Sequence, residues 1–436
     1  MKAILDLIAR HKAGEPCGMF SVCSAHPLVI EATFLHAERS GAPFALVEAT
    51  SNQVNQEGGY TGMNPVDFRD FVHRIADRAG FPRDRVLLGG DHLGPNTWQA
   101  LPAAEAMARA QVLIADYVDA GFRKIHLDCS MSCADDPTPL PDETIAKRAA
   151  RLCAVAERAH MRAEHARVGG EPPVYVIGTE VPVPGGAAEE LGTLAITTPE
   201  AARATIDMHR AIFADAGLTN AWPRVIAIVV QPGVEFDHRK VVPYVPAKAR
   251  ALSRMIEGCE GLIFEAHSTD YQTPAALAAL VRDHFAILKV GPGVTFALRE
   301  ALWALHAIER EWIERGRISG FRDIVMARMK AQPRHWARYY HARGADLDYD
   351  LQYSLSDRIR YYWPDPEIAR AQDKMFRNLA QNPPPPALIS QYLPIAHAAV
   401  RDGLIGSSPA ELAMAHVWAA LDGYHTAVSP LEASGG

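Results

Sequence analysis

His92, Glu180 and His267 lie far apart in the sequence, yet they are residues of the kind that bind a divalent metal ion. Imidazole nitrogens and carboxylate oxygens are the usual protein ligands of a catalytic Zn²⁺, which keeps an open position for the oxygens of a substrate. Asp91 directly precedes His92, and a carboxylate there could act as a general base beside a polarised carbonyl or hydroxyl group. The alternative role for Asp91 is to orient an imidazole. Taken alone, each residue is more often a helix cap or a hydrogen-bonded loop residue, so the prediction depends on their convergence.

The elements that must position these residues are short apolar strands that end in polar residues. Eight runs fit this pattern, at residues 19–25, 44–50, 86–92, 124–130, 174–181, 225–231, 261–267 and 285–291. Continuous Val, Ile and Leu are typical of parallel strands that are covered on both faces. Helical patterns separate the runs, at residues 65–79, 104–121, 142–165, 198–217 and 247–257. This α/β order predicts a (β/α)8 barrel, or TIM barrel, and a doubly wound open sheet is the alternative.

The chain beyond the eighth strand is predicted to be helical. A long amphipathic helix is expected over residues 295–315, so we assign residues 1–312 to the barrel with its metal and substrate site. Residues 313–436 are predicted to form a helical C-terminal region that packs on the barrel, and the last few residues should fray.

Polar side chains gather where the predicted strands end, which is the face of a TIM barrel that carries its active site. Besides the metal candidates, we expect Glu48 or Asp270 to be a second proton-transfer group. Five further residues at these positions are candidates for substrate binding: Ser24, Asn52, Gln53, Asn96 and Asp128.

Phosphate binding is predicted after the seventh and eighth strands, where many TIM barrels hold a phosphate. Ser268, Thr269 and Lys289 offer hydroxyl and ammonium donors, and the backbone around Gly291 and Gly293 offers N–H groups. An ordinary pair of glycine turns is an equally good interpretation. The sequence has neither a P-loop motif nor a dinucleotide-binding glycine motif in a strand-to-helix context, which argues against an ATP-dependent kinase and a dinucleotide enzyme.

Residues 353–364 combine two arginines with hydroxyl and aromatic side chains. Arg358 could contact a phosphate through two of its guanidinium nitrogens. The interpretation we favour for the segment as a whole is that its Tyr and Trp residues anchor the C-terminal helices or a partner subunit.

Composition limits the class of protein. The 44 Lys and Arg against 51 Asp and Glu leave a net charge of −7, which argues against nucleic acid as a partner. The longest buried-looking apolar runs, of about seven residues, are too short to span a membrane. The N-terminus lacks the apolar region of a signal peptide, and the six cysteines form no C-x-x-C pair, so we expect a cytoplasmic protein with reduced thiols.

Several motifs together resemble one known family, the accessory (Z) subunits of tagatose-bisphosphate aldolase, which act in galactitol and N-acetylgalactosamine catabolism. The resemblance covers nearly the whole chain. Its clearest motifs are Cys-Ser-Ala-His-Pro at 23–27, Gly-Asp-His-Leu-Gly-Pro-Asn at 90–96, Gly-Thr-Glu-Val-Pro-Val-Pro-Gly-Gly at 178–186, Glu-Ala-His-Ser-Thr-Asp at 265–270 and Tyr-Ser-Leu-Ser-Asp-Arg at 353–358.

The family is in turn similar to class II aldolases, and this similarity implies a ligand set. It matches Asp91 to the aldolase base, and His92, Glu180 and His267 to metal ligands. Where those enzymes carry a further histidine ligand, this chain has Gln231, whose neutral amide oxygen binds Zn²⁺ more weakly. The implied cofactor is a divalent metal, with Zn²⁺ the first choice and Mg²⁺ or Mn²⁺ the alternatives.

The resemblance implies two functions. One is a metal-dependent 4-epimerase that interconverts D-tagatose 6-phosphate and D-fructose 6-phosphate, or free ketohexoses, by breaking and remaking the C3–C4 bond. Asp91 would be one proton-transfer group, and Ser268, Thr269 and Lys289 would hold the phosphate. The other is a non-catalytic subunit that stabilises a class II D-tagatose-1,6-bisphosphate aldolase. A homo-oligomer is also expected.

Overall fold

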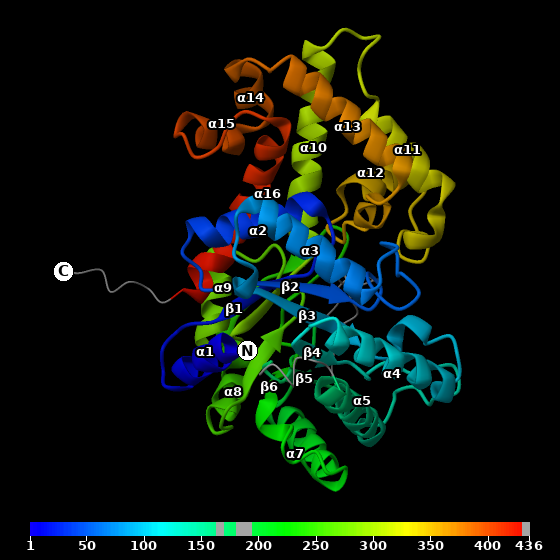
Figure 1. Ribbon diagram of the computed structural model, residues 1–436, viewed down its shortest axis with the longest axis vertical. Helices are drawn as coiled ribbons and strands as arrows, with labels where there is room; N and C mark the ends of the chain where they lie inside the picture. Colours follow the sequence, from blue (N-terminus) through cyan, green and yellow to red (C-terminus); the bar gives the residue numbers. More distant parts are fainter. Residues whose placement is uncertain (163–169, 180–193, 430–436) are drawn as a thin grey trace, which may run out of the picture.

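The computed structural model describes residues 1–162, 170–179 and 194–429. Its centre is a closed barrel of eight parallel strands in the order β1-β10-β9-β6-β5-β4-β3-β2, surrounded by helices (Figure 1). The structure therefore confirms the TIM barrel, and the closure of β1 on both β2 and β10 excludes the open sheet. The barrel strands are β1 (Met19–Val22), β2 (Ala45–Thr50), β3 (Val86–Leu93), β4 (Lys124–Leu127), β5 (Val174–Ile177), β6 (Val225–Val229), β9 (Ile263–Ala266) and β10 (Ile287–Val290).

The helices that surround the barrel begin where the sequence offers a start signal. Proline occupies the first position of several of them, where its missing N–H costs no hydrogen bond. The side chain of Asn64 accepts a hydrogen bond from the backbone of Asp67 and completes a capping box at the start of α3. The surrounding helices are α2 (Pro27–Arg39), α3 (Pro65–Ala79), α4 (Ala103–Asp119), α5 (Asp142–Arg162), α7 (Pro199–Asp215), α8 (Pro246–Glu257), α9 (Pro274–Arg282) and α10 (Pro292–Trp312).

The inside of the barrel is apolar at one end and charged at the other. Helix α1 (Lys2–Lys12) covers the N-terminal end, where Ile4 and Ile8 share a buried cluster with Leu46 and Ile263 of the strands. Further along the barrel, Lys124, the first residue of β4, reaches carboxylates on β2 and β9, which are not its neighbours in the sheet, so these side chains meet inside the barrel. The reactive groups are thus concentrated at the C-terminal end of the strands.

The residues after the barrel form helices that pack on α10 and on the outer ring. The long helix α10 extends beyond the barrel and contacts α11, α13, α14 and α16, whereas α16 also packs against α2 and α9 (Figure 1). These helices are α11 (Phe321–Ala331), α12 (Gly344–Tyr353), α13 (Pro366–Gln381), α14 (Pro386–Tyr392), α15 (Pro394–Arg401) and α16 (Pro409–Val428).

Short elements complete the loops. A two-stranded antiparallel ribbon, β7 (Glu235–Phe236) with β8 (Val241–Val242), follows β6. The 3₁₀ helices are η1 (Arg83–Arg85), η2 (Pro95–Trp98), η3 (Trp222–Arg224), η4 (Pro333–His335) and η5 (Arg358–Tyr362).

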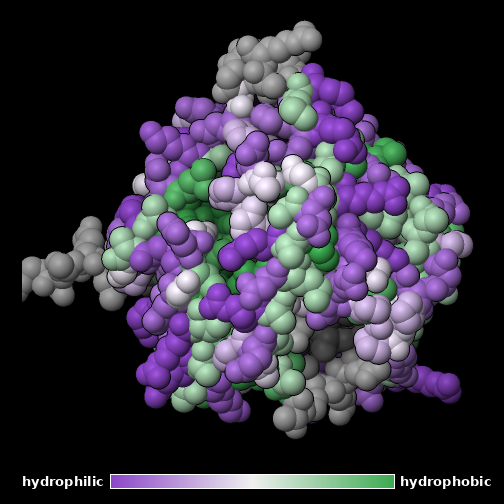
Figure 2. Space-filling view, turned by 90° about the horizontal axis from the view of Figure 1, so that it is seen from below, coloured by the Kyte–Doolittle hydropathy of each residue, from purple (hydrophilic) through white to green (hydrophobic). Residues whose placement is uncertain are grey.

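The surface is mixed in polarity. The face drawn in Figure 2 is covered largely by hydrophilic residues, with hydrophobic ones exposed in smaller areas between them. Among the helices in the described parts of the chain, none combines the length and the hydropathy of a membrane-spanning segment.

Candidate active site

A cavity at the C-terminal end of the barrel brings together residues from β2, β3 and β10 and from the loop that follows β9. Asp91, His92, His267 and Lys289 all line it. Each of the four is at least nine-tenths buried, so these ionisable groups have left bulk water and must be paired with one another. The prediction that distant strand ends converge is therefore reproduced for these four residues.

His92 and His267 face the cavity with one nitrogen each held by a carboxylate. His92 Nδ1 lies 2.7 Å from Asp128 Oδ2, and His267 Nε2 lies 2.9 Å from Glu265 Oε1. The two rings meet edge to face with their centroids 4.9 Å apart. A carboxylate that holds one nitrogen and leaves the other for a metal is the common arrangement around metal-binding histidines.

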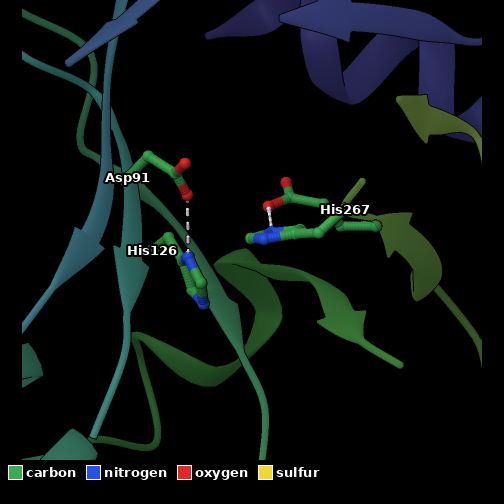
Figure 3. A group of neighbouring side chains, drawn as sticks. Asp91, His126 and His267 are labelled. Atoms are coloured by element: carbon green, nitrogen blue, oxygen red, sulfur yellow. Dashed lines mark hydrogen bonds and ion pairs between the residues drawn. The ribbon is translucent and has the colours of Figure 1, made fainter. Parts of the chain in front are cut away.

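A third histidine lies beneath them. His126 Nδ1 is 3.0 Å from Asp91 Oδ1, and its ring centroid lies 5.2 Å from that of His92 and from that of His267. Figure 3 shows Asp91 and His126 from adjacent strands facing His267 across the barrel. Within the described residues, His126 Nε2 is buried without a hydrogen-bond partner, which is the kind of unfulfilled position that a bound ion would satisfy.

The candidate metal ligands form a pair, which needs at least one further ligand to hold an ion, and a group of four. The pair His92 and His267 borders the cavity, where a substrate could reach the ion. A deeper set consists of Asp91, His126, Glu265 and His267, whose potential ligand atoms all lie within 4.8 Å of one another. His267 belongs to both sets.

The charged groups of the site shift one another's pKa values. Burial of Asp91 opposes its ionisation, but the charge of His92 and the hydrogen bond with His126 outweigh it and hold the pKa of Asp91 well below its usual range. Burial of His92 is likewise outweighed, by the charge of Asp91 and the hydrogen bond with Asp128, and the pKa of His92 rises to about 9. In this arrangement Asp91 is a carboxylate at neutral pH.

Two buried lysines connect the carboxylates. Lys124 Nζ lies 2.8 Å from Glu48 Oε1 and 2.6 Å from Glu265 Oε2, and all three side chains are fully buried. Lys289 Nζ pairs with the other oxygen of Glu48 and lies 3.1 Å from Asp91 Oδ1. Burial lowers the pKa of Lys289 to about 8. Because both oxygens of Glu48 are paired with ammonium groups, Glu48 positions the lysines instead of facing the cavity as a free base.

The groups predicted to hold phosphate are largely occupied within the protein. Thr269 Oγ1 donates to the backbone oxygen of Lys289 at 2.6 Å. The amides of Gly291 and Gly293 donate to Asp270 Oδ1 at 2.9 and 2.7 Å. Asp270 itself lines the cavity, and burial raises its pKa to about 6 in spite of these hydrogen bonds. Ser268 also borders the cavity.

The remaining predicted residues are spread over the rim. Asn52 and Gln53 line the main cavity, and Ser24 lines an adjoining one. Asn96 is buried in η2, and Arg358 lies over the ring of Tyr339.

Two predicted metal ligands do not appear in this cluster. Glu180 lies outside the described residues. Gln231 uses its side-chain oxygen to accept hydrogen bonds from the amides of Gly233 and Val234, at 2.8 and 3.0 Å, so it shapes the turn after β6.

Sequence reasoning missed Lys124, His126 and Glu265. The signal was present, because successive side chains of a strand point to opposite sides and residues two apart share a side. Lys124, His126 and Asp128 therefore face the same way, as do Glu265 and His267. Arg360, one of the two arginines of the 353–364 segment, is not among the predicted site residues, yet it lines the main cavity and donates to the backbone oxygen of Asp357 at 2.9 Å.

Comparison with known proteins identifies a family and similar solved structures. The model of the family described as "D-tagatose-1,6-bisphosphate aldolase subunit GatZ/KbaZ-like" matches residues 4–429. A crystal structure described as a probable tagatose 6 phosphate kinase from Sinorhizobium meliloti 1021 is 51% identical, with a TM-score of 0.86, and the match covers 94% of this chain and 100% of that one. The fructuronate-tagaturonate epimerase UxaE from Cohnella laeviribosi is far more distant, at 14% identity and a TM-score of 0.48, with 94% of this chain and 81% of that one covered.

Proposed function

We propose that this chain, which belongs to the D-tagatose-1,6-bisphosphate aldolase subunit GatZ/KbaZ-like family, is a metal-dependent 4-epimerase of a ketose phosphate. The reaction would interconvert D-tagatose 6-phosphate and D-fructose 6-phosphate. The observation that carries this proposal is the convergence of Asp91, His92 and His267 on one cavity, with a carboxylate holding each of the two histidines. Buried ionisable groups with shifted pKa values that line a cavity are more typical of an active site than of a purely structural core.

His92 and His267 would hold the metal at the border of the cavity, together with Glu180 from outside the described residues. Imidazole ligands favour Zn²⁺ over Mg²⁺ and Mn²⁺, which are the alternatives. When bound, the metal would supply a positive charge that polarises the oxygens of the ketose. Asp128 and Glu265 would fix the ring orientation of the two ligands.

Proton transfer would be carried by two carboxyl groups of the cavity. Asp91 would take the proton of the C4 hydroxyl group, the C3–C4 bond would break to give an enediolate and an aldehyde, and the bond would re-form on the other face of the rotated aldehyde. Lys289, 3.1 Å from Asp91, keeps that carboxylate ionised. We assign Asp270, and not Glu48, as the second proton-transfer group. Asp270 lines the cavity and has a pKa of about 6, close to the working pH.

The experiment is an assay of the purified, Zn²⁺-loaded chain on D-tagatose 6-phosphate with no other protein present. We expect fructose 6-phosphate to form, and the His267→Ala variant to lose that activity while keeping its circular dichroism spectrum. Equal turnover by the variant would refute the site.

A stabilising subunit of a class II aldolase is the second candidate, favoured by the word "subunit" in the family description. Mixing the chain with such an aldolase separates the two functions. An accessory subunit should lengthen the half-life of the aldolase and have no turnover of its own.

A further inference from the structure

A second cavity opens beside the main one, between the barrel loops and the C-terminal helical region. Asn52, Tyr60 and Tyr361 border both cavities, so the two are neighbouring parts of one cleft. Thr97 lines its barrel side, and its hydroxyl group donates to Asn52 Oδ1 at 3.2 Å. The opposite side is formed by η4, η5 and the residues near them.

Arg358 is the central cation of this second cavity. Its side chain lines the cavity although the residue is only 3% exposed, and its guanidinium carbon lies 3.3 Å from the centre of the Tyr339 ring. Its Nη1 reaches the hydroxyl of Tyr361 at 3.5 Å, and its Nε has no hydrogen-bond partner among the described residues. A buried guanidinium with unused donors is costly unless an anion meets it.

Of two further residues of η4 that line the cavity, Arg334 adds to its positive character. Arg334 is exposed, lines the same cavity and donates from Nε to His335 Nε2 at 2.9 Å. The ring of His335 stacks on that of Tyr361, at a centroid distance of 5.2 Å and an angle of 11°. Burial, together with the charges of Arg334 and Arg358, lowers the pKa of His335 to about 4, so this imidazole is neutral and adds no charge to the cavity.

The one carboxylate that lines this cavity among the described residues is already neutralised. Glu57 Oε1 lies 2.7 Å from Arg109 Nη1 and accepts a hydrogen bond from Trp98 Nε1 at 3.2 Å. Within the part of the chain that the structure describes, the two arginines of the cavity are therefore left without a carboxylate of their own.

We propose that the cavity lined by Arg334 and Arg358 binds the phosphate group of the ketose, and that the sugar extends from there into the main cavity. This inference rests on the proposed function and names the part of the substrate that this region recognises. A guanidinium group presents paired N–H donors that match two oxygens of a phosphate. The site predicted from sequence after β9 and β10 is less suited, because the amides of Gly291 and Gly293 already bind Asp270.

Calorimetric binding of D-tagatose 6-phosphate, inorganic phosphate and free D-tagatose tests the proposal. The variants are Arg334→Gln, Arg358→Gln and, as a matched control, Arg338→Gln, an exposed arginine of the same region that does not line the cavity. We expect the first two to raise the Kd of both phosphate-containing ligands by about tenfold or more, as for loss of a charge-assisted hydrogen bond. The Kd of free tagatose and the behaviour of the control should not change.

The exposed position of Arg334 keeps the test valid even if Arg358→Gln fails to fold. Unchanged phosphate affinity in Arg334→Gln, equal losses for phosphorylated and free sugar, or no binding of either phosphate ligand by the wild-type chain would overturn the proposal. If the wild-type chain shows the expected binding pattern but no epimerisation, the phosphate site stands and the proposed reaction is refuted. If the wild-type chain epimerises tagatose 6-phosphate but both variants bind the phosphate ligands with an unchanged Kd, the reaction stands and the phosphate site is refuted.

Discussion

Asp128 Oδ2 lies 2.7 Å from His92 Nδ1, so a carboxylate at the end of β4 holds a histidine at the end of β3. The backbone of His92 has a φ of +48°, a conformation that non-glycine residues adopt rarely and at a cost. The contact and the strained backbone together hold the imidazole at the border of the cavity. Only the folded barrel brings the two residues, 36 positions apart, into contact.

Metal content should depend on this contact. We expect Asp128→Asn to weaken metal affinity by about 10- to 100-fold, since it removes the carboxylate that orients His92. His92→Ala and His267→Ala should lose the ion during dialysis. The measurement is metal content by mass spectrometry, with the exposed His341→Ala as a control. Full metal occupancy in His92→Ala would point to the deeper set around His126 instead.

Removal of the metal should lower the thermal stability of the wild-type chain, because a ligand that binds only the folded state stabilises it. We expect EDTA to reduce the Tm of the wild type and to leave the Tm of His267→Ala unchanged. Scanning calorimetry with and without the chelator makes the comparison. An equal shift in both proteins would show that the chelator acts elsewhere.

Asp91→Asn should reduce turnover of tagatose 6-phosphate by about 10²- to 10⁴-fold, the usual contribution of a general base. The amide keeps the shape of the side chain but cannot accept the proton. Metal content should be retained, which separates a base from a ligand. If the variant loses its metal as well, Asp91 belongs to the ligand set.

Asp270 should make stability depend on pH. Its pKa is raised from 3.8 to about 6 by burial, so the folded state binds its proton more tightly than the unfolded state does. The associated stabilisation is complete below about pH 4 and is lost as the pH rises through about 6, a change of about 3 kcal/mol. In Asp270→Asn this loss should be absent. Urea unfolding of both proteins between pH 4 and 8 measures the difference, and parallel curves would contradict the assignment.

Lys124 should matter to stability far more than a surface lysine. Replacing it by Met leaves Glu48 and Glu265 buried without their shared cation, and we expect a loss of about 3–5 kcal/mol in the free energy of unfolding. Lys147→Met breaks only an exposed pair with Glu143 and should cost less than about 1 kcal/mol. Chemical denaturation of the two variants provides the comparison, and similar losses would refute a structural role for the ion pairs inside the barrel.

The strands could be predicted because each is an apolar run of limited length, and the closed barrel confirmed them. The grouping of Asp91, His92 and His267 followed from the rule that strand ends share one face. The alternation along β4 places Lys124 on the same side as His126 and Asp128, but its burial depends on Glu48 and Glu265, which are distant in sequence.

The sequence by itself determined the (β/α)8 order, the family and the end of the barrel at which ionisable groups collect, since these depend on local periodicity and on short motifs. Only the tertiary structure decided which donors remain free for a substrate. Asp270 takes the amides of Gly291 and Gly293, whereas Arg358, held over Tyr339, keeps its Nε unpaired among the described residues. Such choices depend on contacts between residues far apart in the chain, which no local pattern encodes.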